Sequence, residues 1–488
     1  MPRSGISIIY LLISILLKGV DFMASAKDLT NGKPMNLILG FGIPLLFGFL
    51  FQQFYNAADT AIVGRFLGGD ALGAVGCTGS INFLIIGFVM GICNGFAIPV
   101  AQSYGAGDWE QLRKYVTNSL WLCIAFAAVI TTLTLIFCAD ILQLMDTQPN
   151  FFERSYTYIF TIFAGIPAYF LYNMTAGILR SFGDSKTPVS WLVIASVINI
   201  ILDIVFIINF NMDVFGAALA TVIAQFISGF GCLFKVCRGY GILRMEKGDW
   251  NFSPKHTARL CAMGLPMGLQ YSITAIGSVV LQRAVNGLGE TYVTAITAAN
   301  KLSMFMCCPF DAMGSTMATY AGQNVGAKKW DRLGKGIGSC IVLGAIYAAF
   351  AFVVLFLAGE NLAMIFLDDE SRFMLPLVKQ YLTTLSAFYF FLALVNIVRF
   401  FIQGMGFSPI ATIAGIMEMA ARGIVAYMVG IYGFSAACFS SPLAWVLADI
   451  FLIPAYFICK KHLVKKHSGT ENSSSLPGSA APENAQST

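Results

Sequence analysis

One stretch of this sequence occurs twice, first as Gln102-Ser103-Tyr104-Gly105-Ala106-Gly107-Asp108-Trp109-Glu110-Gln111-Leu112 and again, 221 positions later, as Gln323-Asn324-Val325-Gly326-Ala327-Lys328-Lys329-Trp330-Asp331-Arg332-Leu333. Both copies share Q-x-x-G-A-x-x-W, then an acidic residue and, two positions later, a leucine. Similar spacings relate Gly183 to Gly404, Pro188 to Pro409 and, at 222, Pro44 to Pro266. Two tandem membrane bundles with a seam between them are typical of secondary transporters. The repeat therefore predicts transport.

The composition excludes an ordinary soluble enzyme. Of 488 residues, 57% are hydrophobic and only 11% are charged, whereas about 25% charged residues are usual in soluble domains. The 42 phenylalanines and 47 glycines fit lipid-facing bulk and close helix contacts. The net charge of +5 is no nucleic-acid signature, because the basic residues occupy short loops. Twelve cysteines and three histidines lack the spacing of metal ligands, so we expect neither a metal site nor a disulfide framework.

Twelve apolar spans follow one another along the chain. They run near 36–63, 71–101, 115–138, 155–179, 188–210, 215–236, 257–287, 291–320, 336–358, 374–402, 408–431 and 435–459. Backbone amides in lipid must bond within their own segment, so these spans are expected to be helices. The fold class is therefore an all-α membrane protein with two six-helix lobes.

Lysine and arginine predict the orientation. The N-terminus, the tail and the even-numbered loops hold 22 of them, and the odd-numbered loops hold only Arg65, Arg154 and Arg372. This bias places both termini in the cytoplasm. Six spans per repeat is an even number, so both lobes share one orientation and their pseudo-twofold axis runs along the membrane normal.

These patterns divide the chain into five parts. Residues 1–34 form a cytoplasmic segment, 35–237 the first lobe, 238–256 a cytoplasmic linker, 257–459 the second lobe and 460–488 a disordered cytoplasmic tail. The apolar run 5–17 resembles a signal peptide but is too short to span a membrane. An over-long start, with Met23 as the true first residue, is the alternative that we favour.

Four polar residues stand out within the first lobe. They are Asp59 in the first span, Asn199 and Asp203 one helical turn apart in the fifth, and Thr221 in the sixth. At a rise of 1.5 Å per residue, Asp59, Asp203 and Thr221 each lie on the order of 10 Å below the outer surface. Two carboxylates in one low-dielectric pocket cannot both ionise easily. We therefore expect a proton or Na⁺ site, the alternative being hydrogen bonds that lock helices together.

Two further residues of the first span are candidates for gating or substrate contact. Pro44 removes a backbone hydrogen bond and predicts a kink, which either moves with the charge on Asp59 or is static. Gln52 lies seven residues before Asp59, on roughly the same face. It either contacts substrate or pairs with a neighbour.

The second lobe carries its own charges. Glu418 and Arg422 are four residues apart in one span, which predicts a structural ion pair. Asp311 and Asp449 fall near mid-membrane, about 16–18 Å from the cytoplasmic ends of their helices. There they bind a cationic substrate or pair with Arg399.

Together these residues resemble the multidrug and toxic compound extrusion (MATE) family, in particular its DinF-like branch. The matching motifs are Pro44 through Gln52, Asp59 and Gly64, the paired Q-x-x-G-A loops, Asn199-x-x-x-Asp203 and Gly216-x-Ala218-x-Ala220-Thr221. The resemblance covers about residues 28–461. It implies twelve helices, a central cleft, and export of organic cations and drugs against H⁺ or Na⁺.

The resemblance also implies roles for particular residues. In the DinF-like branch the cation site corresponds to Asp59, Asn199, Asp203 and Thr221. Other branches carry a glutamate in the seventh span where this chain has Thr274, which argues against a cation site of that type in the second lobe.

Two other functions would require residue patterns that differ from this one. A lipid-linked oligosaccharide flippase of the same superfamily would line its cleft with Arg and Lys, which the spans of the first lobe lack. A membrane-embedded enzyme is disfavoured because no H-E-x-x-H motif or nucleophile elbow occurs and none of the three histidines lies within an apolar span. We therefore expect a monomeric, multi-pass inner-membrane antiporter that uses no cofactor, binds no nucleic acid and exchanges drugs for H⁺ or Na⁺ by alternating access.

Overall fold

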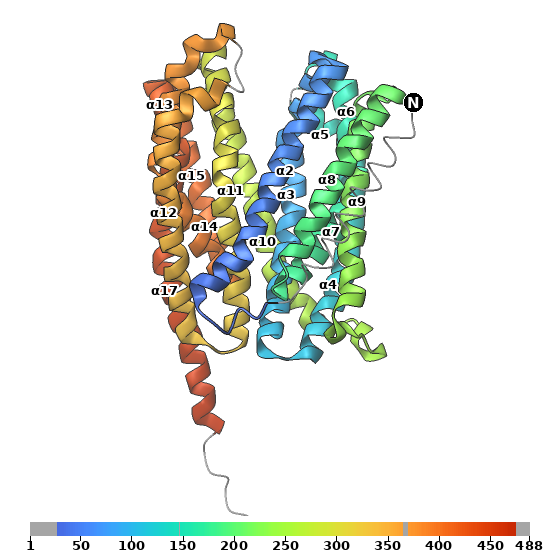
Figure 1. Cartoon of the computed structure of the whole chain (residues 1–488), viewed down its shortest axis with the longest axis vertical. Helices are drawn as coiled ribbons and strands as arrows, with labels where there is room; N and C mark the ends of the chain where they lie inside the picture. The colour runs from blue at the N-terminus through green and yellow to red at the C-terminus, as the bar shows by residue number, and fades with distance from the viewer. Residues whose placement is uncertain (1–26, 146, 365–368, 475–488) are drawn as a thin grey trace, which may run out of the picture.

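The structure is a computed structural model that describes residues 27–145, 147–364 and 369–474. The apolar run 5–17 and Met23 lie outside the described residues, so neither reading of the N-terminus is tested. The helices of the described residues form two lobes that stand side by side in the same orientation (Figure 1). This arrangement is the one that the sequence repeat predicts.

The first lobe, here called the N-lobe, contains the six expected spans. They are α2 (Pro34–Leu67), α3 (Gly69–Ala106), α4 (Trp109–Ile136), α6 (Pro149–Ala164) with α7 (Ile166–Ser181), α8 (Lys186–Ile204) with the π-helix η1 (Val205–Asn209), and α9 (Asp213–Gly239). The short α5 (Cys138–Leu144) connects the third and fourth spans.

The second lobe, the C-lobe, repeats this plan. Its spans are α10 (Pro254–Asn286), α11 (Glu290–Gly326), α12 (Trp330–Ala363), α13 (Leu375–Ala387) with α14 (Tyr389–Gly404), α15 (Ser408–Tyr432) and α17 (Ser440–Ser474). The short η5 (Asp369–Met374) precedes α13, and α16 (Phe434–Cys438) precedes α17.

Within the described residues, nine helices are long and apolar enough to span a membrane, and two bent pairs add two more spans. The twelfth span is α11, which is 37 residues long and packs against α2 and α14. The bent pairs are the fourth span of each lobe, with bends of 44° and 47°. In the N-lobe the bend coincides with Gly165, and Pro167 in the first turn of α7 cannot donate a backbone hydrogen bond to α6. Each of these two spans was expected to be one continuous helix, and that expectation is wrong.

The seam between the lobes depends on small residues. A Cβ on Gly91 of α3 would lie 2.5 Å from the carbonyl oxygen of Met267, and one on Gly95 would lie 2.4 Å from the Cα of Gly264 in α10. Only glycine allows two membrane helices to approach so closely. The repeat relates α3 and α10 to α11 and α2. This second pair also packs across the seam, with the Phe54 and Phe305 rings 5.2 Å apart.

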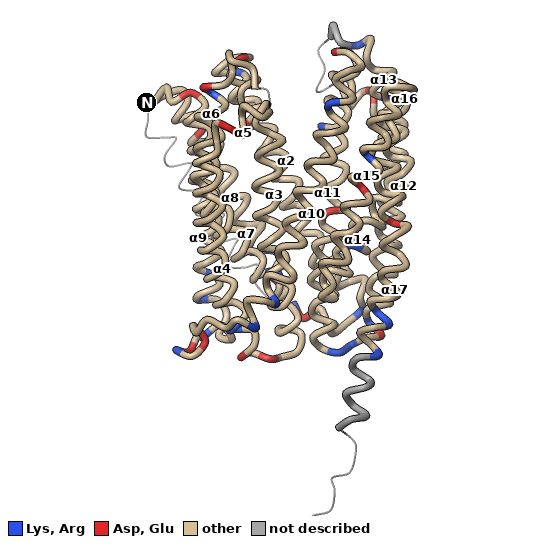
Figure 2. Tube along the Cα trace, turned by 180° about the vertical axis from the view of Figure 1, so that it is seen from behind, with Lys and Arg blue, Asp and Glu red and all other residues tan. Residues whose placement is uncertain are grey.

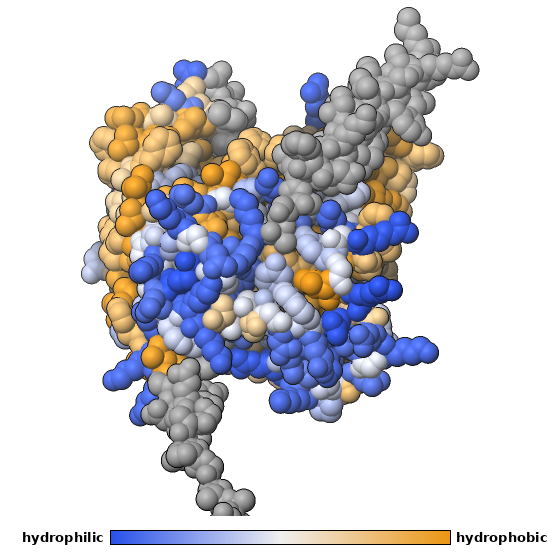
Figure 3. Space-filling view, turned by 60° about the horizontal axis from the view of Figure 1, so that its bottom comes forward, coloured by the Kyte–Doolittle hydropathy of each residue, from blue (hydrophilic) through white to orange (hydrophobic). Residues whose placement is uncertain are grey.

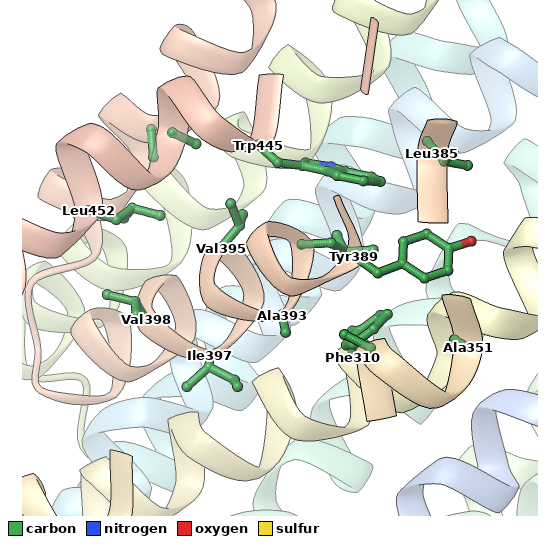
Figure 4. Close-up of a cluster of buried hydrophobic side chains, with 14 of the residues drawn as sticks. Phe310, Ala351, Leu385, Tyr389, Ala393, Val395, Ile397, Val398, Trp445 and Leu452 are labelled. Carbon is green, nitrogen blue, oxygen red and sulfur yellow. The ribbon is translucent and has the colours of Figure 1, made fainter. Parts of the chain in front are cut away.

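Each lobe has its own apolar core. In the C-lobe, Tyr389 packs between Phe310 and Trp445, with ring centroids 5.6 and 6.2 Å away (Figure 4). The hydroxyl of Tyr389 bonds with Ser303 at 3.1 Å, so its burial leaves no unpaired polar group. Phe96, Phe163 and Phe170 are central residues of the N-lobe core. Two separate cores let each lobe behave as one packed unit.

One end of the molecule gathers lysines and arginines, and we call it the basic end (Figure 2). A view of this end shows a hydrophilic face bordered by hydrophobic sides (Figure 3). The interlobe linker lies here and contains the turns η2 (Gly241–Leu243) and η3 (Lys247–Trp250). The chain after Lys460 was expected to be disordered, but α17 continues as a helix to Ser474. Residues 475–488 lie outside the described part.

The structure also corrects one pairing of the repeats. Gly183 and Gly406 both follow the fourth span of their lobe and have positive φ angles of 80° and 96°. Glycine adopts this left-handed conformation without steric cost. Gly183 therefore corresponds to Gly406. The constant offset of 221 pairs Gly183 with Gly404, and that pairing is wrong.

Candidate functional site

Three helices of the N-lobe bring Asp59, Asn199, Asp203 and Thr221 together, as the sequence predicts. Asn199 and Asp203 lie one turn apart on α8 and are fully buried. When the Asn199 amide nitrogen faces Asp203, it donates to Asp203 Oδ2 at 3.2 Å, and the amide oxygen accepts from the Thr221 N–H at 3.1 Å. Asn199 therefore ties α8 to α9 and fixes the position of the Asp203 carboxyl group.

Asp59 of α2 completes this cluster. Its carboxyl group faces that of Asp203 closely enough to share a hydrogen bond when one of them carries a proton. Among the described residues, no lysine or arginine interacts with either carboxyl group, and Oδ1 of each has no hydrogen-bond partner. Buried carboxylates without a counter-charge are costly. The site is thus suited to bind a proton or a small cation.

Three tyrosines surround the carboxylates and were not singled out from the sequence. The Tyr55 hydroxyl bonds with Thr221, and Tyr158 and Tyr169 lie beside Asp59. Tyr55 is four residues before Asp59, so helical spacing alone was enough to find it. Tyr158 lies before the bend at Gly165 and Tyr169 lies after it. No feature of the sequence indicates that both side chains reach Asp59.

The helix carrying Asp203 changes its winding directly after the site. α8 ends at Ile204 and continues as a π-helix from Val205 to Asn209. Short π segments are frequent at functional sites because they offset side chains from the regular helical face. This feature was also missed, since the sequence reads as one apolar helix.

Pro44 and Gln52 lie on the same helix as Asp59. Pro44 is in the interior of α2, which continues on both sides of it. Gln52 is half-buried two turns before Asp59. The structure brings neither residue into the carboxylate cluster.

The C-lobe charges form a different arrangement. Glu418 is buried between Arg399 and Arg422, and its direct partner is Arg399. The Arg422 guanidinium lies 3.9 Å from Glu418 and donates to the Thr274 carbonyl at 3.0 Å. The predicted Glu418–Arg422 pair is therefore the weaker half of a triad. Its stronger half crosses from α14 to α15, which spacing along one helix does not show.

The two remaining C-lobe acids differ in environment. Asp449 is buried near Arg399, yet neither of its oxygens has a hydrogen-bond partner among the described residues. Asp311 is exposed on α11, and within the described chain it forms no ion pair. Of the two predicted pairings with Arg399, only that of Asp449 is present, and it is an electrostatic interaction without a hydrogen bond.

Arg180 is one of the 22 basic residues that the sequence assigns to the cytoplasmic segments and even-numbered loops, and for this residue the assignment to a loop is wrong. It lies in the last turn of α7, and its guanidinium donates to Asn94 of α3 at 3.1 Å. Both residues line a cavity of about 40 Å³ between the lobes, with Ser181, Met267, Ser315 and Thr319. The N-lobe thus presents a cation at the seam that the apolar pattern concealed.

Below this cavity the two Q-x-x-G-A loops close the basic end. Gln102 Nε2 donates to the Gly404 carbonyl of the C-lobe at 3.0 Å, and Gln323 Nε2 donates to the Ser181 carbonyl of the N-lobe at 2.8 Å. A Cβ on Gly105 would lie 2.0 Å from the Gln323 carbonyl oxygen, and one on Gly326 would lie 1.8 Å from that of Gln102. Each loop therefore packs on its own copy, which explains why the motif occurs twice.

Comparison with known proteins agrees with this geometry. A family model described as MatE matches residues 44–205 and 266–457. The probable multidrug resistance protein YpnP of Bacillus subtilis (strain 168) is 27% identical over 422 residues, which cover 84% of this chain and 90% of that protein. DNA damage-inducible protein F of Escherichia coli (strain K12) is 26% identical over 336 residues, or 66% of this chain and 70% of that one.

A solved structure shares the fold. The outward-facing conformation of a multidrug resistance MATE family transporter has a TM-score of 0.84 at 22% identity, over 91% of this chain and 99% of that chain. The family model spans both lobes in two segments, one per repeat. The chain therefore belongs to the MatE family, and it is a multi-pass membrane transporter rather than an enzyme.

Proposed function

We propose that this protein is an H⁺- or Na⁺-coupled antiporter that exports organic cations or amphipathic drugs by alternating access. The observation that carries the proposal is the meeting of Asp59 and Asp203, on α2 and α8, with no basic residue beside them in the described chain. Relatives named as multidrug resistance proteins support drugs as the substrate class.

The orientation follows from charge. We place the basic end (Figure 2) on the cytoplasmic side of a bacterial inner membrane, because cytoplasmic loops are enriched in Lys and Arg. With that end closed by Gln102 and Gln323, the lobes diverge toward the opposite, external side (Figure 1). We therefore assign this conformation to the outward-facing half of the cycle.

In the proposed cycle, an ion from outside binds at Asp59 and Asp203. Asn199 and Thr221 hold the Asp203 carboxyl group in place and offer further oxygen ligands to Na⁺. Neutralising Asp59 removes the negative charge that attracts a cationic drug, so drug is released outward. When the ion leaves toward the cytoplasm, the charge returns and the next drug molecule binds.

The ion gradient supplies enough energy for this exchange. A difference of one pH unit is worth about 1.4 kcal/mol, and each charge moved through 100 mV adds about 2.3 kcal/mol. An equilibrium constant changes tenfold for each 1.4 kcal/mol. Exchange of one proton for one monovalent cationic drug moves no net charge, so each pH unit then sustains about a tenfold drug gradient. Exchange of one proton for a neutral drug also uses the membrane potential.

Dye efflux from proteoliposomes tests the proposal. Wild type and Asp203→Asn are compared under separate proton and sodium gradients, with ethidium inside. We expect wild type to export ethidium under one of the two gradients and the variant under neither. Absence of export from wild type under both gradients would reject drug antiport for this probe.

The alternative function, a lipid-linked oligosaccharide flippase, has one observation in its favour. Arg180 faces the interlobe cavity, and no described carboxylate pairs with it, so the seam offers one cation to an anionic head group. A flippase needs several cations to hold a pyrophosphate. Both substrates are tested in the same proteoliposomes. Export of ethidium under an ion gradient, without movement of a fluorescent lipid-linked sugar, favours the drug antiporter.

A further inference from the structure

Each lobe holds the stretch of chain that leads into the first helix of the other lobe. Residues 28–32 precede α2 of the N-lobe and lie against the C-lobe; we call them the first strap. Residues 249–257, which precede α10 of the C-lobe and include its first turn, lie against the N-lobe; we call them the second strap. Both lie at the basic end, where the lobes are closed.

The first strap is bound through its backbone. Leu29 is fully buried in the C-lobe core, its N–H donates to Gln323 Oε1 at 2.9 Å, and its carbonyl accepts from Asn324 at 3.2 Å. Lys329 Nζ donates to the Thr30 carbonyl at 2.9 Å and to Asn31 Oδ1 at 2.7 Å. These contacts tie the start of an N-lobe helix to the C-lobe.

Arg332 adds two more bonds to the same strap. Its Nη1 donates to the Gly32 carbonyl at 2.9 Å and its Nη2 to the Leu29 carbonyl at 3.4 Å. Gly183 of the N-lobe approaches the residue just before the strap so closely that a Cβ there would lie 2.0 Å from the Lys27 carbonyl oxygen. The strap therefore contacts the C-lobe, and the residue before it contacts the N-lobe.

The second strap is bound by α4 of the N-lobe. Arg113 forms an ion pair with Asp249 at 2.7 Å, and Thr117 donates to the Asp249 carbonyl at 2.6 Å. Asn118 accepts from the Ser253 N–H at 2.9 Å, and Gln111 bonds with His256 at 2.7 Å. These bonds join the entrance of a C-lobe helix to the N-lobe.

The two straps are related by the repeat but differ in chemistry. Lys329 and Arg332 stand at the repeat positions of Asp108 and Gln111. The C-lobe thus grips the first strap with two cations bound to carbonyl oxygens. Hydrogen bonds with a charged partner are stronger than neutral ones.

We propose that the straps form a reciprocal cytoplasmic latch, and that the Lys329 and Arg332 bonds to the first strap set how strongly the transporter favours the outward-facing state. Moving the lobes apart at the cytoplasmic side pulls the start of α2 away from the C-lobe, so the first strap must leave its site. This proposal rests on the orientation and alternating access proposed above.

Cysteine labelling from the cytoplasmic side tests the latch. Ser315 lines the interlobe cavity just above the closed loops, so Ser315→Cys in a cysteine-free background reports when that side opens. In inside-out vesicles, Lys329→Gln and Arg332→Gln should react with a membrane-impermeant maleimide about tenfold faster than the parent, a shift of about 1.4 kcal/mol in the opening equilibrium. The matched control is Lys335→Gln, because the Lys335 side chain is exposed. Labelling of both strap variants at the rate of the control would overturn the proposal.

A reversible cross-link gives a second, independent test. Asn31→Cys and Lys329→Cys replace two side chains that bond directly, and a short bis-methanethiosulfonate joins them. We expect the cross-linked protein to lose dye export and a reductant to restore it. Export at an unchanged rate would show that the strap stays docked throughout the cycle, against the proposal. If the wild-type protein exports no dye, the proposed function fails, whereas the labelling of Ser315→Cys still decides the latch.

Discussion

The N-lobe and the C-lobe each bury a group of carboxylates among helices of the same order, but the neighbours of these carboxylates differ. In the N-lobe, Asp59 and Asp203 face each other among hydroxyl and amide groups. In the C-lobe, Glu418 lies between two arginines. A carboxylate held by arginine stays ionised and keeps its partner, whereas two unpaired carboxylates respond to any added cation. The comparison assigns the proposed ion coupling to the N-lobe, whereas the C-lobe uses its buried carboxylate to hold two arginines.

The largest expected effect comes from neutralising the N-lobe site. Asp203→Asn keeps the shape of the side chain but removes its charge, so the ion gradient no longer drives export. We expect the rate of gradient-driven ethidium efflux to fall at least about a hundredfold, or about 2.7 kcal/mol. Asp70→Asn, at an exposed acid of the same lobe, is the control and should transport normally. If Asp203→Asn exports at the wild-type rate, coupling does not depend on this cluster.

The C-lobe triad should show the opposite pattern. Glu418→Gln leaves Arg399 and Arg422 buried without their shared partner, which typically costs about 3–5 kcal/mol of stability. We expect a lower melting temperature in detergent, with the ion dependence of transport unchanged in the protein that remains folded. A variant of wild-type stability that has lost its ion dependence would erase the contrast between the lobes.

A smaller effect is expected from the two glutamines of the closed loops, and it should differ between them. Gln102 and Gln323 donate equivalent hydrogen bonds across the seam, each worth about 1 kcal/mol. Gln102→Ala should raise cytoplasmic labelling of Ser315→Cys about fivefold. Gln323→Ala should raise it further, because Gln323 also holds the first strap through Leu29. Equal effects of the two variants would argue that the strap adds nothing to closure.

The smallest effect concerns pH at the second strap. Burial alone raises the pKa of Asp249, but the Glu246 N–H and the Arg113 guanidinium hold it below its ordinary value of 3.8. The stability that this ion pair adds is therefore present above that value and is lost only as pH falls through the lowered pKa. We expect Arg113→Gln to leave the midpoint of the transport–pH profile unchanged near neutrality. A shifted midpoint would assign part of the pH response to the linker.

Much of this architecture could be predicted from the sequence, because lipid imposes long apolar helices and the repeat imposes two lobes. The convergence of Asp59, Asp203 and Thr221 followed from counting residues to the outer surface, since helical rise is constant. The Arg399–Glu418 pair did not follow, because it joins different helices whose rotation about their own axes depends on packing.

Other features were missed for related reasons. Arg180 ends an apolar run and reads as a loop cation, although its long side chain turns back to reach Asn94. The binding of the first strap could not be predicted, because the strap contains no recognisable motif and the residues that bind it are 294 to 303 positions away in the sequence. The disagreement between Gly404 and Gly406 arose because one offset was applied to repeats that differ in length by two residues near this turn.

The contact between the two Q-x-x-G-A loops joins one motif to its own copy, with each glycine against the glutamine of the other copy, as in the isologous interface of a twofold homodimer. In a homodimer of six-helix halves, any substitution appears on both sides of the axis at once. In a single chain, a change at Asp59 or Arg399 affects one lobe and leaves the shared interface intact. Covalent fusion therefore permits what identical subunits cannot have: one half that carries the proposed proton or sodium site, joined to a half that buries a carboxylate between two arginines.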